Sequence, residues 1–143
     1  MSFQAFRALI ETRVNDAYSA LSTPVPVVFD NVGGEPPGTE YVELAISYTS
    51  TTESILCPDE AGIEVIRGDV QLAIYAPRGN GMGRLETLAT EGLKVLNKLN
   101  DWALPNPGSV YVKAGQVLGP VYVTTGSDPL VVANVSAPFT AHD

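Results

Sequence analysis

The sequence contains few of the residues that perform catalysis or hold metals. Among 143 residues there is one cysteine, Cys57, and one histidine, His142. A single cysteine excludes a disulfide within the chain, and a histidine beside the C-terminus does not supply a base for a serine or cysteine nucleophile. Asp59 and Glu60 do not complete a zinc site with these two residues at a recognised spacing. We therefore expect no catalytic residue, no metal site and no cofactor, and we interpret the protein as a non-enzyme.

Positive charge and long apolar runs are also scarce. The chain has 8 Lys and Arg against 16 Asp and Glu, a formal net charge of −8. The basic residues are dispersed, so no stripe of them neutralises a row of phosphates, and an acidic surface lets DNA pass without specific binding. The apolar runs are too short to span a membrane, and the first residues lack the pattern of a secretory signal. With 45% hydrophobic residues, the chain has the composition of one globular domain over residues 1–143.

The most regular stretch is residues 61–100, which predicts a strand, a turn rich in glycine and a helix. Apolar and polar side chains alternate over 64–77, as is typical of a half-buried strand. Its buried face is predicted to carry Ile66, Val70, Leu72, Ile74 and Ala76. From Arg84 to Asn100 the apolar residues recur at helical spacing. The buried stripe of that helix is predicted to contain Leu85, Leu88, Ala89, Gly92, Leu96 and Leu99.

The remaining segments predict a second helix and further strands. Residues 2–21 have helical spacing, and residues 26–29 form a short strand whose prolines indicate a sheet edge. Residues 40–48 alternate as a strand that pairs antiparallel with 64–77, followed by a polar tip at 50–54. The other predicted segments are strands at 110–112, 121–124 and 131–139 and a turn-rich stretch at 114–120. The pattern indicates an α+β fold, a mostly antiparallel sheet of about five or six strands packed against two helices.

The glycines of the turn, Gly79, Gly81 and Gly83, resemble part of a dinucleotide-binding loop. The full fingerprint needs its third glycine at position 84, where this chain has Arg84, and it needs a parallel βαβ unit. A plain turn between a strand and a helix is therefore the favoured interpretation. A small nucleotide-binding module that uses Gly79–Gly83 stays as an alternative.

Two loops and two arginines are the candidates for contacts with partners. The segment 30–39 has glycines and prolines without apolar periodicity, and it is long for a loop in a small domain. Arg78 and Arg84 flank the glycine turn, where they are either solvated charges or partners of acids in a neighbouring subunit. The candidate interface residues are Gly33, Gly34, Glu35, Pro36, Pro37, Thr51, Thr52, Glu53, Arg78 and Arg84.

Several segments, taken in order, resemble one protein family. An N-terminal helix precedes Pro-Val-Val-Phe-Asp-Asn at 26–31, a Pro-Pro pair at 36–37 and Tyr-Val-Glu-Leu at 41–44. Ile-Tyr-Ala-Pro at 74–77 then leads into Arg-Gly-Asn-Gly-Met-Gly, and the last strand ends in Ala-Pro-Phe at 137–139. This series resembles the tail terminator proteins of long-tailed bacteriophages. The resemblance covers nearly the whole chain, and residues 101–119 are its least similar part.

The resemblance implies a structural role. Proteins of this family are small α/β subunits that close into a hexameric ring on the finished tail tube, stop its polymerisation and join it to the neck. Expected partners are further copies of this chain, the tail tube protein, a neck or head-completion protein and, in a contractile tail, the sheath protein. DNA passes through the ring without specific binding. The expected location is the tail–neck junction of the virion, after assembly in the host cytoplasm, and a neck connector or tail-completion protein is the alternative of the same class.

Overall fold

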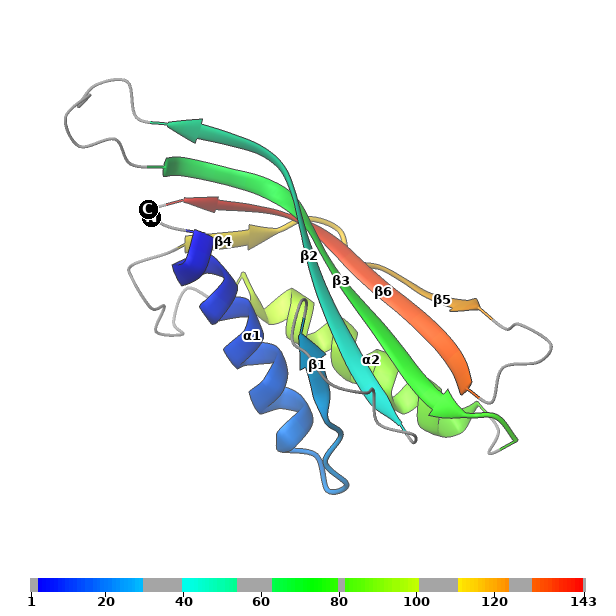
Figure 1. The fold of residues 1–143 in the computed structure, drawn as a ribbon. Coiled ribbons are helices and arrows are strands. Elements are labelled where there is room, and N and C mark those ends of the chain that lie inside the picture. The colour runs from blue at the N-terminus through cyan, green and yellow to red at the C-terminus, as the bar shows by residue number, and fades with distance from the viewer. Residues whose placement is uncertain are drawn as a thin grey trace.

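The computed structural model describes residues 3–29, 40–53, 63–79, 82–100, 111–123 and 130–142. Within these ranges the chain forms two helices and a six-stranded sheet, stacked as two layers (Figure 1). The elements in chain order are α1 (Phe3–Ser19), β1 (Val27–Phe29), β2 (Tyr41–Glu53), β3 (Ile63–Pro77), α2 (Gly83–Lys98), β4 (Tyr111–Ala114), β5 (Leu118–Val123) and β6 (Leu130–His142). The predicted α+β class and the predicted order of helices and strands are confirmed.

Three long strands, β2, β3 and β6, form the centre of the sheet. The strand order is β1-β2-β3-β6-β4, and β5 also pairs with β6. β1 runs parallel to β2, whereas the other described pairs are antiparallel. β1 lies at the sheet edge, as the prolines near it indicated. β3 therefore has an antiparallel neighbour on each side for most of its length.

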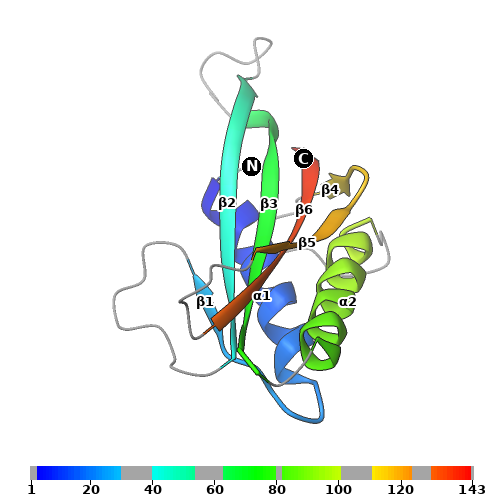
Figure 2. The same ribbon diagram turned by 90° about the vertical axis from the view of Figure 1, so that its right-hand side faces the viewer.

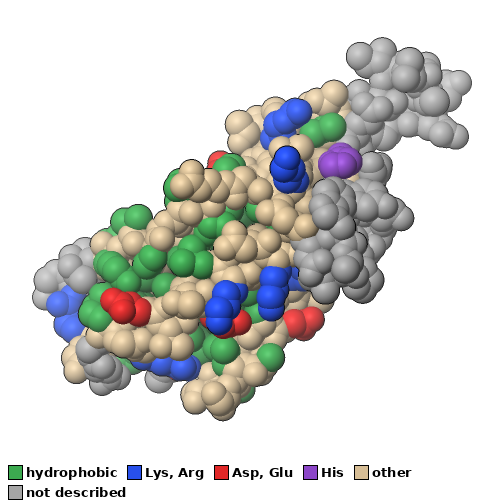
Figure 3. All heavy atoms as spheres, turned by 180° about the vertical axis from the view of Figure 1, so that it is seen from behind, with side chains coloured by type: hydrophobic (Ala, Val, Ile, Leu, Met, Phe, Trp, Pro, Cys, Tyr) green, Lys and Arg blue, Asp and Glu red, His purple; other side chains and the backbone are tan. Residues whose placement is uncertain are grey.

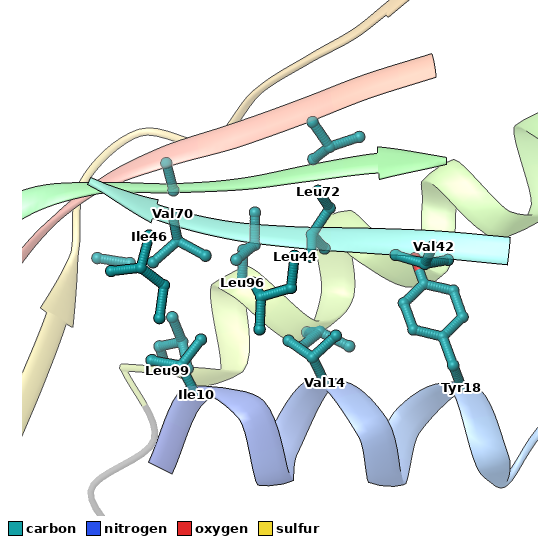
Figure 4. Close-up of a cluster of buried hydrophobic side chains, with 14 of the residues drawn as sticks. Ile10, Val14, Tyr18, Val42, Leu44, Ile46, Val70, Leu72, Leu96 and Leu99 are labelled. Atoms are coloured by element: carbon teal, nitrogen blue, oxygen red, sulfur yellow. The ribbon is translucent and has the colours of Figure 1, made fainter. Parts of the chain in front are cut away.

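Both helices cover the same face of the sheet, which we call the inner face (Figures 1 and 2). The core lies between the layers, and Figure 4 shows part of it. The strands contribute Val42, Leu44, Ile46, Ile66, Val70, Leu72, Ile74, Ala133, Val135 and Ala137 to it. The helices contribute Phe6, Leu9, Ile10, Val14, Tyr18, Leu85, Leu88, Ala89, Val95 and Leu96. Since burying one large apolar side chain contributes about 1.5–3 kcal/mol, this core is the main source of stability.

The periodic patterns predicted the buried faces of β3 and α2 correctly. Every residue predicted for the buried face of β3 is at most 5% exposed, and the predicted stripe of α2 is buried, together with Val95. α1 is slightly shorter than predicted and ends at Ser19, ahead of Pro24. In α2, Glu86 in the first turn and Lys98 in the last turn match the helix dipole.

The polar tip predicted at 50–54 is wrong for the residues that the structure describes. Thr51, Thr52 and Glu53 belong to β2, which pairs with β3 up to Glu53↔Ile63. An irregularity between Tyr48 and Ser50 shifts the register, and the pairing then resumes. Threonine is β-branched and favours strands when it has a pairing partner, so the polarity of this segment was a misleading sign of a loop. Residues 54–62 lie outside the described residues.

Two predictions at the C-terminal side are also wrong. β5 begins at Leu118, inside the stretch predicted as a turn, and β6 continues beyond the predicted end at residue 139 to His142, which pairs with Val65 and Tyr111. Pro138 is compatible with a strand interior because β6 changes its neighbour there: β5 pairs up to Ser136 and β4 begins at Phe139. The carbonyl of Pro138 accepts a hydrogen bond from the Gly115 N–H at 2.7 Å.

One buried hydrogen bond joins the two helices. The Tyr18 hydroxyl, fully buried on α1, donates to the Leu88 carbonyl on α2 at 2.9 Å. Burial is the main reason that the pKa of Tyr18 is raised well above its usual value. A Cβ on Gly92 would lie 3.0 Å from that hydroxyl and 3.3 Å from Cδ1 of Leu72. Gly92 therefore makes room for the contact between the helices.

We expect Gly92→Ala to lower the free energy of unfolding by about 1 kcal/mol. Overpacking costs about 1–3 kcal/mol, and the higher helix propensity of alanine offsets about 1 kcal/mol of that cost. In a Tyr18→Phe background the hydroxyl is gone, so the same substitution should be neutral or stabilising. Urea unfolding of the wild type, the two single variants and the double variant gives the coupling free energy between Tyr18 and Gly92. An equal cost of Gly92→Ala in both backgrounds would show that the hydroxyl does not set the spacing.

Candidate partner-binding surface

The face of the sheet opposite the helices, which we call the outer face, has an ordered set of cross-strand rows. One row joins Tyr41, Tyr75, Val132 and Val123, since each is the register partner of the next. The next row joins Glu43, Ala73, Asn134 and Val121 in the same way. Small side chains at Ala45 and Ala73 lie between larger ones, which leaves a hollow in this face.

The hollow is an open groove of about 360 Å³. It is lined by Glu43, Ala45, Gln71, Ala73, Tyr75, Val123, Val132 and Asn134. The lining is mixed, with one carboxylate and two amides among apolar groups. Such a surface suits contact with another protein better than it suits a small ligand, which usually needs an enclosed pocket.

Tyr75 lies at one end of the groove and stacks on Tyr41. The rings of Tyr41 and Tyr75 stack with their centroids 4.4 Å apart and an interplanar angle of 9°. The Tyr75 hydroxyl donates a long hydrogen bond to Oε2 of Glu43 at 3.4 Å. Partial burial, the charge of Glu43, the neighbouring Tyr41 and this hydrogen bond together raise the pKa of Tyr75. Glu43 of the next row is therefore held against this aromatic pair.

β5 exposes apolar side chains along the edge of this face. The register places Leu118, Val121 and Val123 on the outer face, with exposed fractions of 54%, 60% and 44%. We call these three residues the β5 patch. In the described part of the chain, β5 pairs only with β6, so its other edge has no strand beside it. Hydrophobic side chains gather over a broad area in the view from behind (Figure 3).

Tyr122 differs from its neighbours because it pairs with buried Ala133 and so points to the inner side. Partial burial, the charge of Glu86 and a hydrogen bond to Glu86 raise the pKa of Tyr122. Glu86 is in the first turn of α2. This contact joins β5 to the helix layer.

Arg84 connects three parts of the chain. Its guanidinium contacts both carboxylate oxygens of Glu40 at 2.8–3.2 Å, and its Nη2 donates to the Thr23 carbonyl at 3.1 Å. The hydrogen bonds to Glu40 are the main reason that the pKa of Arg84 is raised. The start of α2 is thereby joined to the residue before β2 and to the segment after α1.

The described residues among the predicted interface candidates lie at two ends of the sheet, Thr51–Glu53 at one end and Arg78 and Arg84 at the other. Gly33, Gly34, Glu35, Pro36 and Pro37 lie outside the described residues. Thr51 and Thr52 are exposed near the end of β2, and Glu53 ends that strand. Arg78 is exposed after β3, at the opposite end of the sheet.

Arg84, at the start of α2, pairs with Glu40 of its own chain, so its predicted pairing with a neighbouring subunit is not supported. The β5 patch was not among the predicted residues. Its sequence looks like that of an ordinary strand, and only the sheet order shows that it lies at an edge.

The glycine turn lacks the surroundings of a dinucleotide site. β3, which leads into it, is antiparallel to both of its neighbours, so α2 does not follow a strand of a parallel βαβ unit. Met82 takes the N-cap position of α2, without a side-chain cap. Gly79 has a φ of +95°, which supports the interpretation of a plain turn.

Comparisons with known proteins show the fold and no more. A solved structure of a protein without a descriptive name matches this chain with 22% sequence identity and a TM-score of 0.75. The match covers 100% of this chain and 97% of that one. No protein-family model matches the chain. A search of curated proteins also finds no match.

The described residues contain no group of three or more His, Cys, Asp or Glu side chains that could hold a metal ion. None of the described helices is long and apolar enough to cross a membrane.

The Arg84–Glu40 pair should contribute measurably to stability. In a double-mutant cycle of Arg84→Met and Glu40→Gln, we expect a coupling free energy of about 0.5–1 kcal/mol at low salt. This value is near the upper end for partly exposed ion pairs, because the contact is bidentate. The matched control is Lys94 and Glu91, whose closest atoms are 3.9 Å apart and whose lysine is 62% exposed. Urea unfolding measures both couplings, and equal values would show that the geometry of Arg84 adds nothing.

Glu43→Gln should lower the pKa of Tyr75 toward its ordinary value of about 10. Because the folded state favours the neutral phenol, Tyr75 contributes stability that is present below pH ~10 and is lost as the pH rises through the folded pKa. Difference absorbance at 295 nm between this chain and its Tyr75→Phe variant isolates the titration. An unchanged midpoint in Glu43→Gln would show that Glu43 does not act on Tyr75.

Proposed function

We propose that this protein is a structural tail terminator of a long-tailed bacteriophage. Copies of the chain close into a hexameric ring on the tail tube, stop tube polymerisation and present a surface to the neck or head-completion protein. The role is geometric and needs no bond making or breaking. The series of segments from the first helix to Ala137-Pro-Phe is the sequence support for this proposal.

The observation that carries the proposal is the β5 patch. Its side chains are about half exposed, and within the described part of the chain they lie on a strand that pairs along one edge only. An apolar edge of this kind is a liability in a protein that stays alone, because it offers a template for unwanted pairing. A permanent partner removes that liability. Assembly into a larger structure therefore gives these side chains a function.

The rest of the outer face also fits contact with proteins. The open groove beside the β5 patch has the mixture of apolar centre and polar groups that protein interfaces have. The net charge of −8 keeps the free subunit soluble, and it suits a ring through which DNA moves without binding.

The proposal is tested with tail tubes. We expect native mass spectrometry to detect six copies, either free or bound to tube ends, and we expect added protein to stop elongation of tubes grown from tube protein. Tube length is measured by electron microscopy, with an unrelated acidic protein of similar size as the control. Tubes that grow equally long at every concentration, together with a chain that stays monomeric on them, would contradict the proposal.

A further inference from the structure

Ala73 lies between four larger side chains on the outer face. It is the register partner of Glu43 on β2 and of Asn134 on β6, so these two residues flank it across the sheet. Gln71 and Tyr75 flank it along β3, two residues away on either side. All five residues line the groove. From strand geometry, the opposite walls are about 10 Å apart across the strands and about 13 Å apart along β3. We call this depression the Ala73 site.

The polar groups around Ala73 have hydrogen-bonding capacity that the described residues leave unused. The half-buried carboxylate of Glu43 accepts one long hydrogen bond, from the Tyr75 hydroxyl at 3.4 Å. Within the described ranges, the side-chain amides of Gln71 and Asn134 make no hydrogen bond to another residue. The site therefore offers three groups with acceptor oxygens, one of them charged, around a single small depression.

The basic side chains of the described residues do not neutralise Glu43. The ion pairs among these residues use other carboxylates, and Arg84 is held by both oxygens of one of them. Arg67 and Lys113 share a row about 20 Å along β3 from the Ala73 site, and Arg78 follows the end of β3 on the other side. The further acids on or beside this face are Glu40, which Arg84 neutralises, Asp69 and Glu86. The site thus carries a negative charge without a cation of its own.

A guanidinium group fits the chemistry of the Ala73 site. It is planar, has five N–H donors and no acceptor, and prefers carboxylate and amide oxygens. It also stacks on aromatic rings, and Tyr75 uses one ring face for Tyr41 while Val132 lies next to it on the other side. The aliphatic stem of an arginine can pack on Val123 and Val132, which line the same groove. A lysine ammonium is compact and strongly hydrated, so it would use these features less well.

Two observations indicate where such an arginine comes from. The net charge of −8 makes copies of this chain repel one another, which favours a different protein as its source. The Ala73 site is also continuous with the β5 patch, because Val123 lines the groove and Val121 is the register partner of Asn134. Residues on either side of a bound arginine would therefore meet exposed apolar side chains.

From these observations we infer that the Ala73 site binds an arginine side chain of a partner protein, with apolar neighbours of that arginine covering the β5 patch. Charge complementarity at Glu43 selects the partner, and the apolar contact adds area. The inference goes beyond the proposed function, since it concerns the groove of one subunit and does not require that copies form a ring.

Blocked tripeptides test the site directly. The probe is Val-Arg-Val, and the matched control is Val-citrulline-Val, in which a neutral urea group replaces the guanidinium. We expect Val-Arg-Val to shift the side-chain amide signals of Gln71 and Asn134 in ¹⁵N–¹H NMR spectra, with a dissociation constant on the order of millimolar, because one side chain buries little area. The citrulline peptide should bind at least tenfold more weakly, and added salt should weaken only the arginine peptide.

Two substitutions separate the local charge from the overall charge. Glu43→Gln removes the carboxylate of the Ala73 site and should weaken binding of Val-Arg-Val at least tenfold. Asp16→Asn removes the same charge from an exposed position of α1, in the other layer, and should leave binding unchanged. Thermal melting checks that both variants remain folded.

Several outcomes would overturn the inference. Equal binding of the citrulline peptide, or no binding of either peptide, would exclude a guanidinium site. Equal losses in Glu43→Gln and Asp16→Asn would assign binding to the net charge, and a Val-Lys-Val peptide that binds as tightly would overturn the choice of arginine. Shifts confined to residues away from the groove would place the contact elsewhere. A chain that binds the probe as expected but never stops tube growth would support the site and contradict the proposed tail function.

Discussion

The register of β3 between β2 and β6 is the constraint on which the rest of the structure depends. β3 has an antiparallel partner on each side, so its side chains can only point to the helix layer or to the outer face. A slip of one residue would move Leu72 and Ile74 out of the core and bring Gln71 toward it. The cost of burying polar groups therefore selects one register. That register determines the core and, at the same time, the composition of the outer face.

The asymmetry of the two layers leaves one face of the sheet without a covering helix in the described residues. Both helices are used to cover one face, and the described residues place no helix on the other (Figure 2). On that face the rows change in character from the stacked tyrosines to Arg67 and Lys113. The apolar residues of β5 extend the face at its edge, held by the contact of Tyr122 with Glu86. The surface is thus a direct consequence of how the core is closed.

Sequence reasoning predicted the parts of the fold that local periodicity controls. The stripe from Leu85 to Leu99 and the alternation from Ile66 to Ala76 each repeat often enough to identify the element and its buried face. Predictions failed where pairing with a distant segment decides the outcome. Thr51 and Thr52 look like loop residues by composition, yet β3 provides them with partners.

The candidate site was harder to predict than the fold, for the same reason. The sequence shows that Val121 and Val123 suit a strand, but not that the strand lies at an edge with those side chains facing outward. The role of Arg84 depends on Glu40, which is distant in sequence and adjacent in space. The number of charges was known from the composition, whereas the position of Glu43, Arg67 and Lys113 on one face of the sheet needed the strand register.

Continuity of the strands also fixes how distant parts of the outer face lie relative to one another. β3 and β6 pair without interruption from Val65↔His142 to Pro77↔Leu130. The stacked tyrosines at one end of this face and Arg67 and Lys113 at the other are therefore held by the hydrogen bonds of one sheet, not by a linker. A heterologous ring of the kind we propose closes only when each copy turns the next by a constant angle, and a hinge within the subunit would allow open chains instead. An unbroken sheet is the kind of support that the proposed ring would require.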